Sequence, residues 1–190
     1  VQGLWGGTFH SVGSRMLRRH SDRMGYGKDY TILDRDDSVQ LIKTIAGESK
    51  SKAVKEKKFP KADKILEMIS LAANIRLPLR ELLEQKYFSQ LAYMEEILWI
   101  DKHYQSRKKA ANAMDFDELL SLWLELLVKH PDILERYQEQ FHFVLVDEFQ
   151  DTNSIQAEIV QKRAARHNNV MAVGDDAQSI YSWRGADVEN

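Results

Sequence analysis

The stretch that decides the fold is Phe-Val-Leu-Val-Asp-Glu at residues 143–148, together with Val-Met-Ala-Val-Gly-Asp at residues 170–175. Each begins with four apolar residues, the length of a short buried strand, and then turns acidic. Residues 154–166 between them have the composition of a helix. The order strand, helix, strand predicts a buried parallel sheet. Because ligands of such sheets bind beyond the carboxyl ends of the strands, we expect a site where the two acidic groups lie.

The acidic pair after the first strand, Asp147 and Glu148, has the Walker B form. The first carboxylate can hold Mg²⁺, largely through water, because that ion keeps much of its hydration shell. The second can orient and deprotonate an attacking water. Strands also end on acids that meet only solvent, so the pair by itself leaves both interpretations open.

The remainder of the chain predicts mostly helices. Apolar residues recur at helical spacing in four segments before the first strand, at residues 11–20, 38–45, 61–74 and 79–104. In the last of these, one apolar face is expected to contain Leu83, Tyr87, Leu91, Met94 and Leu98. The expected fold class is therefore α/β, with parallel strands and a largely α-helical region within the chain.

Composition excludes several classes of protein. Of the 190 residues, 43% are hydrophobic and 29% are charged, which is ordinary for a globular protein. No apolar run is long enough to cross a membrane. The absence of cysteine excludes disulfides and thiolate metal sites, and it is compatible with a reducing cytoplasm. Because the chain lacks an initiator Met and ends abruptly on residues 185–190, we expect it to be a piece of a longer protein.

Charge is distributed unevenly along the sequence. Residues 1–64 carry 14 Lys and Arg against 8 Asp and Glu, a net charge of +6, whereas residues 65–190 carry a net charge of -8. A basic half can be a solvated face or a surface for phosphates, and the charge balance does not distinguish the two.

Three strings of residues occur in a fixed order along the chain: Thr-Phe-His-Ser at residues 8–11, Asp-Glu-Phe-Gln-Asp-Thr-Asn at 147–153, and Val-Gly-Asp-Asp-Ala-Gln-Ser-Ile-Tyr-Ser-Trp-Arg-Gly-Ala at 173–186. They resemble the TFHS motif and motifs II and III of the UvrD, PcrA and Rep group of superfamily one DNA helicases. With the connecting residues 17–33, the resemblance covers nearly the whole chain. Two departures are Phe149, where Tyr is commoner, and Ala177, where Asp is common.

The resemblance implies a RecA-like core of the P-loop NTPase type, interrupted by a helical insertion. Residues 1–12 and 114–190 would belong to the core, and residues 13–113 to the insertion. The phosphate-binding string Gly-x-x-x-x-Gly-Lys-Ser/Thr does not occur in the sequence. Without its backbone N–H groups and lysine the triphosphate has no cradle, so we expect the chain alone not to hydrolyse ATP.

The resemblance also implies roles for individual residues. Asp147 would hold Mg²⁺, Glu148 would be the general base, and Gln178 would contact the γ-phosphate of ATP. Single-stranded DNA would meet two groups of side chains, namely Thr8, Phe9, His10 and Ser11 in the first string and Tyr181, Trp183 and Arg184 in the third. Aromatic rings stack on any base, which suits a motor that moves along DNA of any sequence. Purely structural roles compete with this view, with Trp183 in a core and Ser11 capping a helix.

The whole protein is accordingly expected to be a cytoplasmic, ATP-dependent and Mg²⁺-dependent DNA helicase that moves 3′ to 5′ in repair or replication. Its partners would be single-stranded DNA and junctions of single-stranded with double-stranded DNA. Two alternatives are the motor subunit of a helicase-nuclease and a nonhydrolysing DNA-binding module that keeps the motifs as relics. The intact Asp147, Glu148 and Gln178 favour a working motor.

Overall fold

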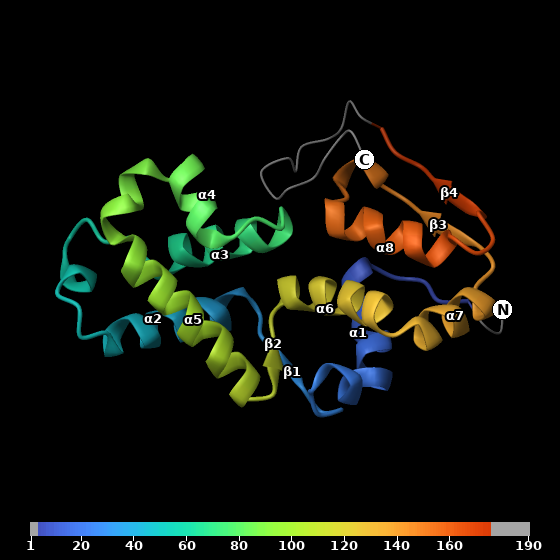
Figure 1. Ribbon diagram of the computed structural model, residues 1–190, viewed down its shortest axis with the longest axis horizontal. Helices are drawn as coiled ribbons and strands as arrows, with labels where there is room; N and C mark the ends of the chain where they lie inside the picture. Colours follow the sequence, from blue (N-terminus) through green and yellow to red (C-terminus); the bar gives the residue numbers. More distant parts are fainter. Residues whose placement is uncertain (1–3, 176–190) are drawn as a thin grey trace. The chain divides into compact units, whose positions relative to one another are not determined.

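The computed structural model describes residues 4–175, which divide into two compact units (Figure 1). The middle unit comprises residues 29–117, and the flanking unit comprises the described residues on either side of it. These units are defined by packing within the chain, and the insertion expected at residues 13–113 stays a prediction. Residues 13–28 belong to the flanking unit because helix α1, Phe9–His20, packs there through Gly13 against Trp123.

The middle unit is built mainly of helices. Its elements are β1 Thr31–Ile32, α2 Arg35–Glu48, the 3₁₀ turn η2 Ala53–Lys55, α3 Ala62–Asn74, α4 Leu79–Lys86, η3 Phe88–Tyr93, α5 Met94–Ala110 and β2 Ala113–Met114. The strands β1 and β2 pair in parallel, with Thr31 opposite Ala113. Asp34 caps α2 by accepting a hydrogen bond from the backbone N–H of Asp37.

The prediction of one continuous helix at residues 79–104 is wrong. The chain forms α4, then the 3₁₀ segment η3, then α5, and the predicted face residue Leu91 is 38% exposed. A straight helix of that length would extend about 39 Å and could not return to one core. The break lets Leu83 of α4 and Ile97 of α5 reach the same buried cluster, which also contains Ile65 of α3.

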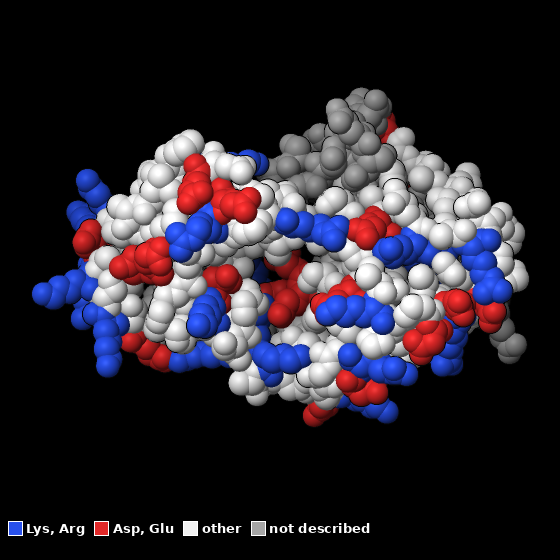
Figure 2. All heavy atoms as spheres, viewed as in Figure 1, with Lys and Arg blue, Asp and Glu red and all other residues white. Residues whose placement is uncertain are grey.

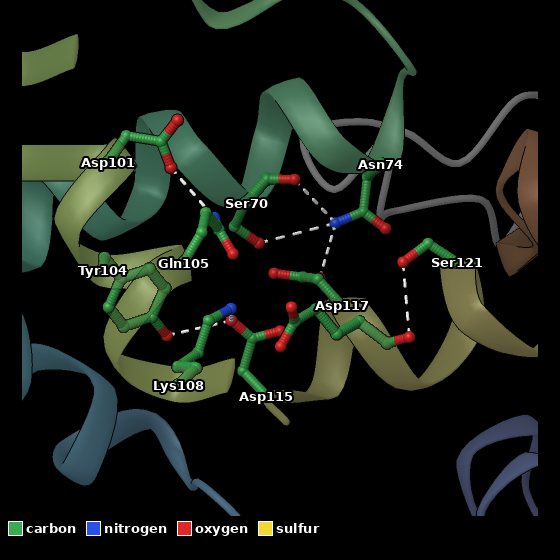
Figure 3. Close-up of polar contacts among 10 residues, drawn as sticks. Ser70, Asn74, Asp101, Tyr104, Gln105, Lys108, Asp115, Asp117 and Ser121 are labelled. Atoms are coloured by element: carbon green, nitrogen blue, oxygen red, sulfur yellow. Dashed lines mark hydrogen bonds and ion pairs between the residues drawn. The ribbon is translucent and has the colours of Figure 1, made fainter. Parts of the chain in front are cut away.

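A buried polar cluster lies at the end of α5 in the middle unit (Figure 3). The Lys108 ammonium is 2.5 Å from Asp115 Oδ2, and the Tyr104 hydroxyl donates to the same oxygen at 2.9 Å. The side chains of Lys108 and Asp115 are only 1% and 10% exposed. Nearby, the Asn74 amide donates to Asp117 Oδ1 at 2.8 Å. Burial raises the pKa of the carboxyl groups of Asp117 and Asp101.

The flanking unit contains the predicted strand, helix, strand sequence. Its elements are α1, η1 Ser21–Met24, most of α6 Phe116–Lys129, α7 Pro131–Gln140, β3 Val144–Val146, η4 Phe149–Asp151, α8 Ser154–Ala164 and β4 Val170–Ala172. Pro131 stands in the first turn of α7, as expected from its fixed φ. The helix α8 packs against α7 and β3.

The parallel pairing of the two strands is confirmed, but their expected burial is not. Val144 lies opposite Val170 and Val146 opposite Ala172. Val146 is buried, whereas Leu145 is 69% and Met171 is 59% exposed. Among residues 4–175 this sheet has only two strands, and α8 packs against β3, so much of the apolar surface of the strands remains uncovered. No helix in this described range is long and apolar enough to span a membrane.

Candidate functional site

The carboxylates Asp147 and Glu148 lie directly after β3, at the edge of the sheet where β4 also ends. Both are exposed. The backbone turns sharply here, because Glu148 adopts the left-handed conformation with φ of 53° and ψ of 44°. That conformation is uncommon for a residue with a Cβ and occurs often at functional sites. The backbone N–H of Glu148 donates to Asp147 Oδ1 at 3.0 Å, which connects the two residues.

The ends of the two strands are joined by the side chain of Gln150, which is buried. Its Nε2 donates to Glu148 Oε2 at 2.5 Å, and its Oε1 accepts from the backbone N–H of Asp175 at 3.0 Å. A backbone bond from Phe149 N–H to the Val173 carbonyl, at 2.9 Å, reinforces the link. The structure therefore brings the second string of the sequence into direct contact with the beginning of the third.

Gly174 allows this close approach. A Cβ added at Gly174 would lie 2.6 Å from Gln150 Oε1 and 3.2 Å from the Gln150 backbone nitrogen. Real Cβ atoms essentially never come as close as the first distance, so any larger residue would displace the Gln150 amide. The glycine that follows the second strand thus leaves the room in which the Gln150 amide lies.

The residues after Gln150 hold the turn in place. The Thr152 hydroxyl donates to the Phe149 carbonyl at 2.7 Å. Asn153 caps α8 by accepting from the Gln156 backbone N–H, and the Gln156 side chain accepts from the Asn153 N–H, both at 2.9 Å. This reciprocal capping box fixes the start of α8 relative to the carboxylates.

The donors at this edge suit Mg²⁺ chemically. That ion prefers oxygen ligands, and proteins bind it through one or two carboxylates while waters and substrate phosphates complete the shell. Asp147 offers an exposed carboxylate of this kind. Among residues 4–175 no group of three or more His, Cys, Asp or Glu side chains converges as a metal site, so phosphate and water ligands would be needed.

The first string, Thr8 to Ser11, begins α1 elsewhere in the flanking unit. Thr8, and not Ser11, is the N-cap: its Oγ1 accepts from the Ser11 N–H at 3.2 Å, while the Ser11 hydroxyl donates to the Thr8 carbonyl at 2.9 Å. Thr8 and Ser11 are exposed and His10 is half-buried. The Phe9 ring packs 6.4 Å from that of Trp123, so it anchors the segment.

The basic face of α1 is exposed, whereas its opposite face is held in place by packing. The indole N–H of Trp123 donates to Met16 Sδ at 3.0 Å. Arg15 and Arg19 lie over the Trp5 ring at 5.1 and 4.7 Å. Over the molecular face in Figure 2, basic and acidic side chains alternate and do not gather into one patch.

Four predicted site residues, Gln178, Tyr181, Trp183 and Arg184, lie outside the described residues. Sequence reasoning gave no role to Gln150, whose contacts place it at the centre of the carboxylate edge. Its signal in the sequence was its place in the second string, two residues after Glu148.

Comparison with known proteins agrees with this arrangement of motifs. The model of the UvrD/REP helicase N-terminal domain matches residues 1–190. The chain is 39% identical over 190 residues to the ATP-dependent DNA helicase PcrA of Bacillus subtilis, covering 98% of this chain and 24% of that protein. It is 40% identical over 190 residues to DNA helicase II of Haemophilus influenzae, covering 99% and 25%. The chain thus spans about a quarter of the length of these relatives.

Proposed function

This chain belongs to the UvrD/REP helicase family, and from that premise we propose that it forms part of the ATP-binding core of a DNA helicase. The proposal rests on the pair of carboxylates at the end of β3. Gln150 links this pair to Asp175, the residue that follows β4 and Gly174. Ligands of parallel sheets bind at such strand ends. The flanking unit would then be part of a RecA-like domain, and the middle unit the bulk of its helical insertion.

In this function the carboxylates have different tasks. Asp147 would hold Mg²⁺, which when bound neutralises charge on the phosphates of ATP. Glu148 would accept the proton of the attacking water. Gln178 would contact the γ-phosphate. The exposure of Asp147 and Glu148 gives a nucleotide access to both.

Contacts with single-stranded DNA would come from two segments. Thr8, His10 and Ser11 carry donors suited to phosphates, and they lie in and beside the first turn of α1, where backbone N–H groups also favour an anion. Phe9 would support them through Trp123. Tyr181 and Trp183 would stack on bases, each stack contributing about 1–3 kcal/mol, and Arg184 would contact the strand.

The whole protein would move 3′ to 5′ along single-stranded DNA and open junctions with duplex DNA, in the cytoplasm, using ATP. Direction and junction binding follow from the family resemblance. Because the sequence contains no phosphate-binding loop, residues 1–190 alone would not turn over ATP.

The decisive experiment measures the ATPase rate of the full-length protein with and without single-stranded DNA, comparing the wild type with Glu148→Gln. We expect strong stimulation by DNA and its loss in the variant. Glu135→Gln, an exposed position on α7, is the matched control and should behave as the wild type. A folded full-length protein that shows no stimulation would favour the nonhydrolysing DNA-binding module. DNA cleavage alongside ATP turnover would favour the helicase-nuclease.

A further inference from the structure

We propose that Gln150 is a positioning residue that orients the Glu148 carboxylate and ties it to the backbone after β4. The inference deepens the proposed function and rests on it, because it takes Glu148 as the general base. Gln150 itself touches no nucleotide in this proposal. It acts through Glu148 on one side and through Asp175 on the other.

The amide of Gln150 has one donor end and one acceptor end, and each has a definite partner. Nε2 donates to Glu148 Oε2 at 2.5 Å, and Oε1 accepts from Asp175 N–H at 3.0 Å. The residue is 7% exposed, so water competes little for these bonds. A carboxylate side chain that is exposed, such as that of Glu148, otherwise samples several rotamers. The bond to Gln150 favours one of them.

The backbone around Gln150 makes this restraint stiff. The Asp151 N–H donates to the Glu148 carbonyl at 3.0 Å, closing the 3₁₀ turn in which Gln150 lies. On the other side, Gly174 leaves just enough room for the amide. A shift of the backbone at residues 174 and 175 would therefore move the Glu148 carboxylate through the side chain of Gln150. Such coupling acts in both directions in binding free energy.

The contact also has a chemical consequence for hydrolysis. The Gln150 amide takes one of the two lone pairs of Glu148 Oε2 and holds the carboxylate in place, so the proton of the attacking water would pass to Oε1, which keeps both of its lone pairs. The water oxygen then bonds to the γ-phosphorus, and the bond from that phosphorus to the leaving ADP oxygen breaks, giving ADP and phosphate.

Two nearly isosteric variants of the full-length protein test the proposal through kcat and KM for ATP in DNA-stimulated turnover. Gln150→Met removes both hydrogen bonds, so kcat should fall about 10- to 100-fold. KM for ATP should change little, because Gln150 touches no nucleotide.

Gln150→Glu keeps the acceptor for Asp175 N–H but places a second carboxylate against Glu148. Its kcat should also be low, because repulsion between the two carboxylates moves Glu148 from the position that Gln150 gives it, and KM for ATP should again change little. A fall in kcat at an unchanged KM in both variants is a result that a purely structural role of Gln150 would not give.

Gln156→Met is the matched control, since it weakens the α8 capping box close to the site without touching Glu148. Its kcat should stay within about twofold of the wild-type value, which corresponds to a change of well under 1 kcal/mol in the activation free energy. If Gln156→Met lowers kcat as much as Gln150→Met, or if the Gln150 variants raise KM for ATP and leave kcat unchanged, the positioning role is overturned.

Failure of the inference can be told apart from failure of the proposed function. If Glu148→Gln abolishes turnover while Gln150→Met keeps kcat within about twofold of the wild type, only the role of Gln150 is wrong. If Glu148→Gln retains DNA-stimulated turnover, the proposed base itself is wrong. Thermal unfolding of each variant identifies any loss of activity that comes from misfolding. If Gln150→Met misfolds, kcat and KM of the nearly isosteric Gln150→Glu decide.

Discussion

Replacing Lys108 by Ala should strongly destabilise the middle unit. Lys108 is the buried partner of Asp115, with their charged atoms 2.5 Å apart and their side chains 1% and 10% exposed. Removing one member of such a pair leaves a buried charge without compensation, which costs about 3–5 kcal/mol. The total stability of a domain is about 5–15 kcal/mol, so this single change removes a large share of it.

The structure indicates how to separate this charge effect from lost packing. In the double variant Lys108→Met with Asp115→Asn both charges disappear, and the Asn carbonyl still offers an acceptor to the Tyr104 hydroxyl. Most of the lost stability should return, because apolar or neutral replacements of a complete buried pair are often nearly neutral. Lys102→Ala, an exposed position on the same helix, should change stability by less than about 0.5 kcal/mol.

Amide hydrogen exchange of α5, read by mass spectrometry, measures the opening free energy of the middle unit without interference from the flanking unit. The expected loss of stability corresponds to amide hydrogen exchange in α5 that is about a hundredfold to several-thousandfold faster in Lys108→Ala than in the wild type. A loss below about 1 kcal/mol, or a double variant no more stable than Lys108→Ala, would refute the view that the buried charge of Asp115 dominates.

Three further predictions concern stability. Gly13→Ala should cost about 1–3 kcal/mol in thermal unfolding, despite the better helix propensity of Ala, because the new Cβ would lie 2.9 Å from Trp123 Cε3; an unchanged midpoint would contradict this. Asn153→Ala should cost about 0.5–2 kcal/mol in urea denaturation through loss of the α8 cap, and Gln161→Ala, exposed on the same helix, should cost less. Burial raises the pKa of Asp101, so ionisation of this group destabilises the fold. The stability of the wild type relative to Asp101→Asn should therefore fall as pH rises above the ordinary Asp value of 3.8. A parallel pH dependence of the two proteins would contradict this prediction.

Local sequence determined much of the flanking unit. The apolar runs at 143–146 and 170–173 predict two strands, and the helix between them implies that they are parallel, as the register of Val144 with Val170 confirms. The position of Asp147 and Glu148 at the strand end follows from chain order alone. These features depend on a few neighbouring residues and on the rule that a helical crossover joins parallel strands.

Features set by distant contacts required the tertiary structure. The break between α4 and α5 arises because both helices pack on one core, and periodicity continues across it without a signal. The exposure of Leu145 depends on how many strands and helices surround it, which its own sequence does not state.

Gln150 shows the difference most clearly. In the sequence it is a polar residue of the second string, and nothing there states whether its side chain is buried or solvated. Its two partners, Glu148 and the backbone of Asp175, are 2 and 25 residues away. The sequence by itself determined which chemical groups the chain carries to the strand ends. Only the folded chain, by pairing β3 with β4 and leaving room at Gly174, decided that one buried amide would connect them.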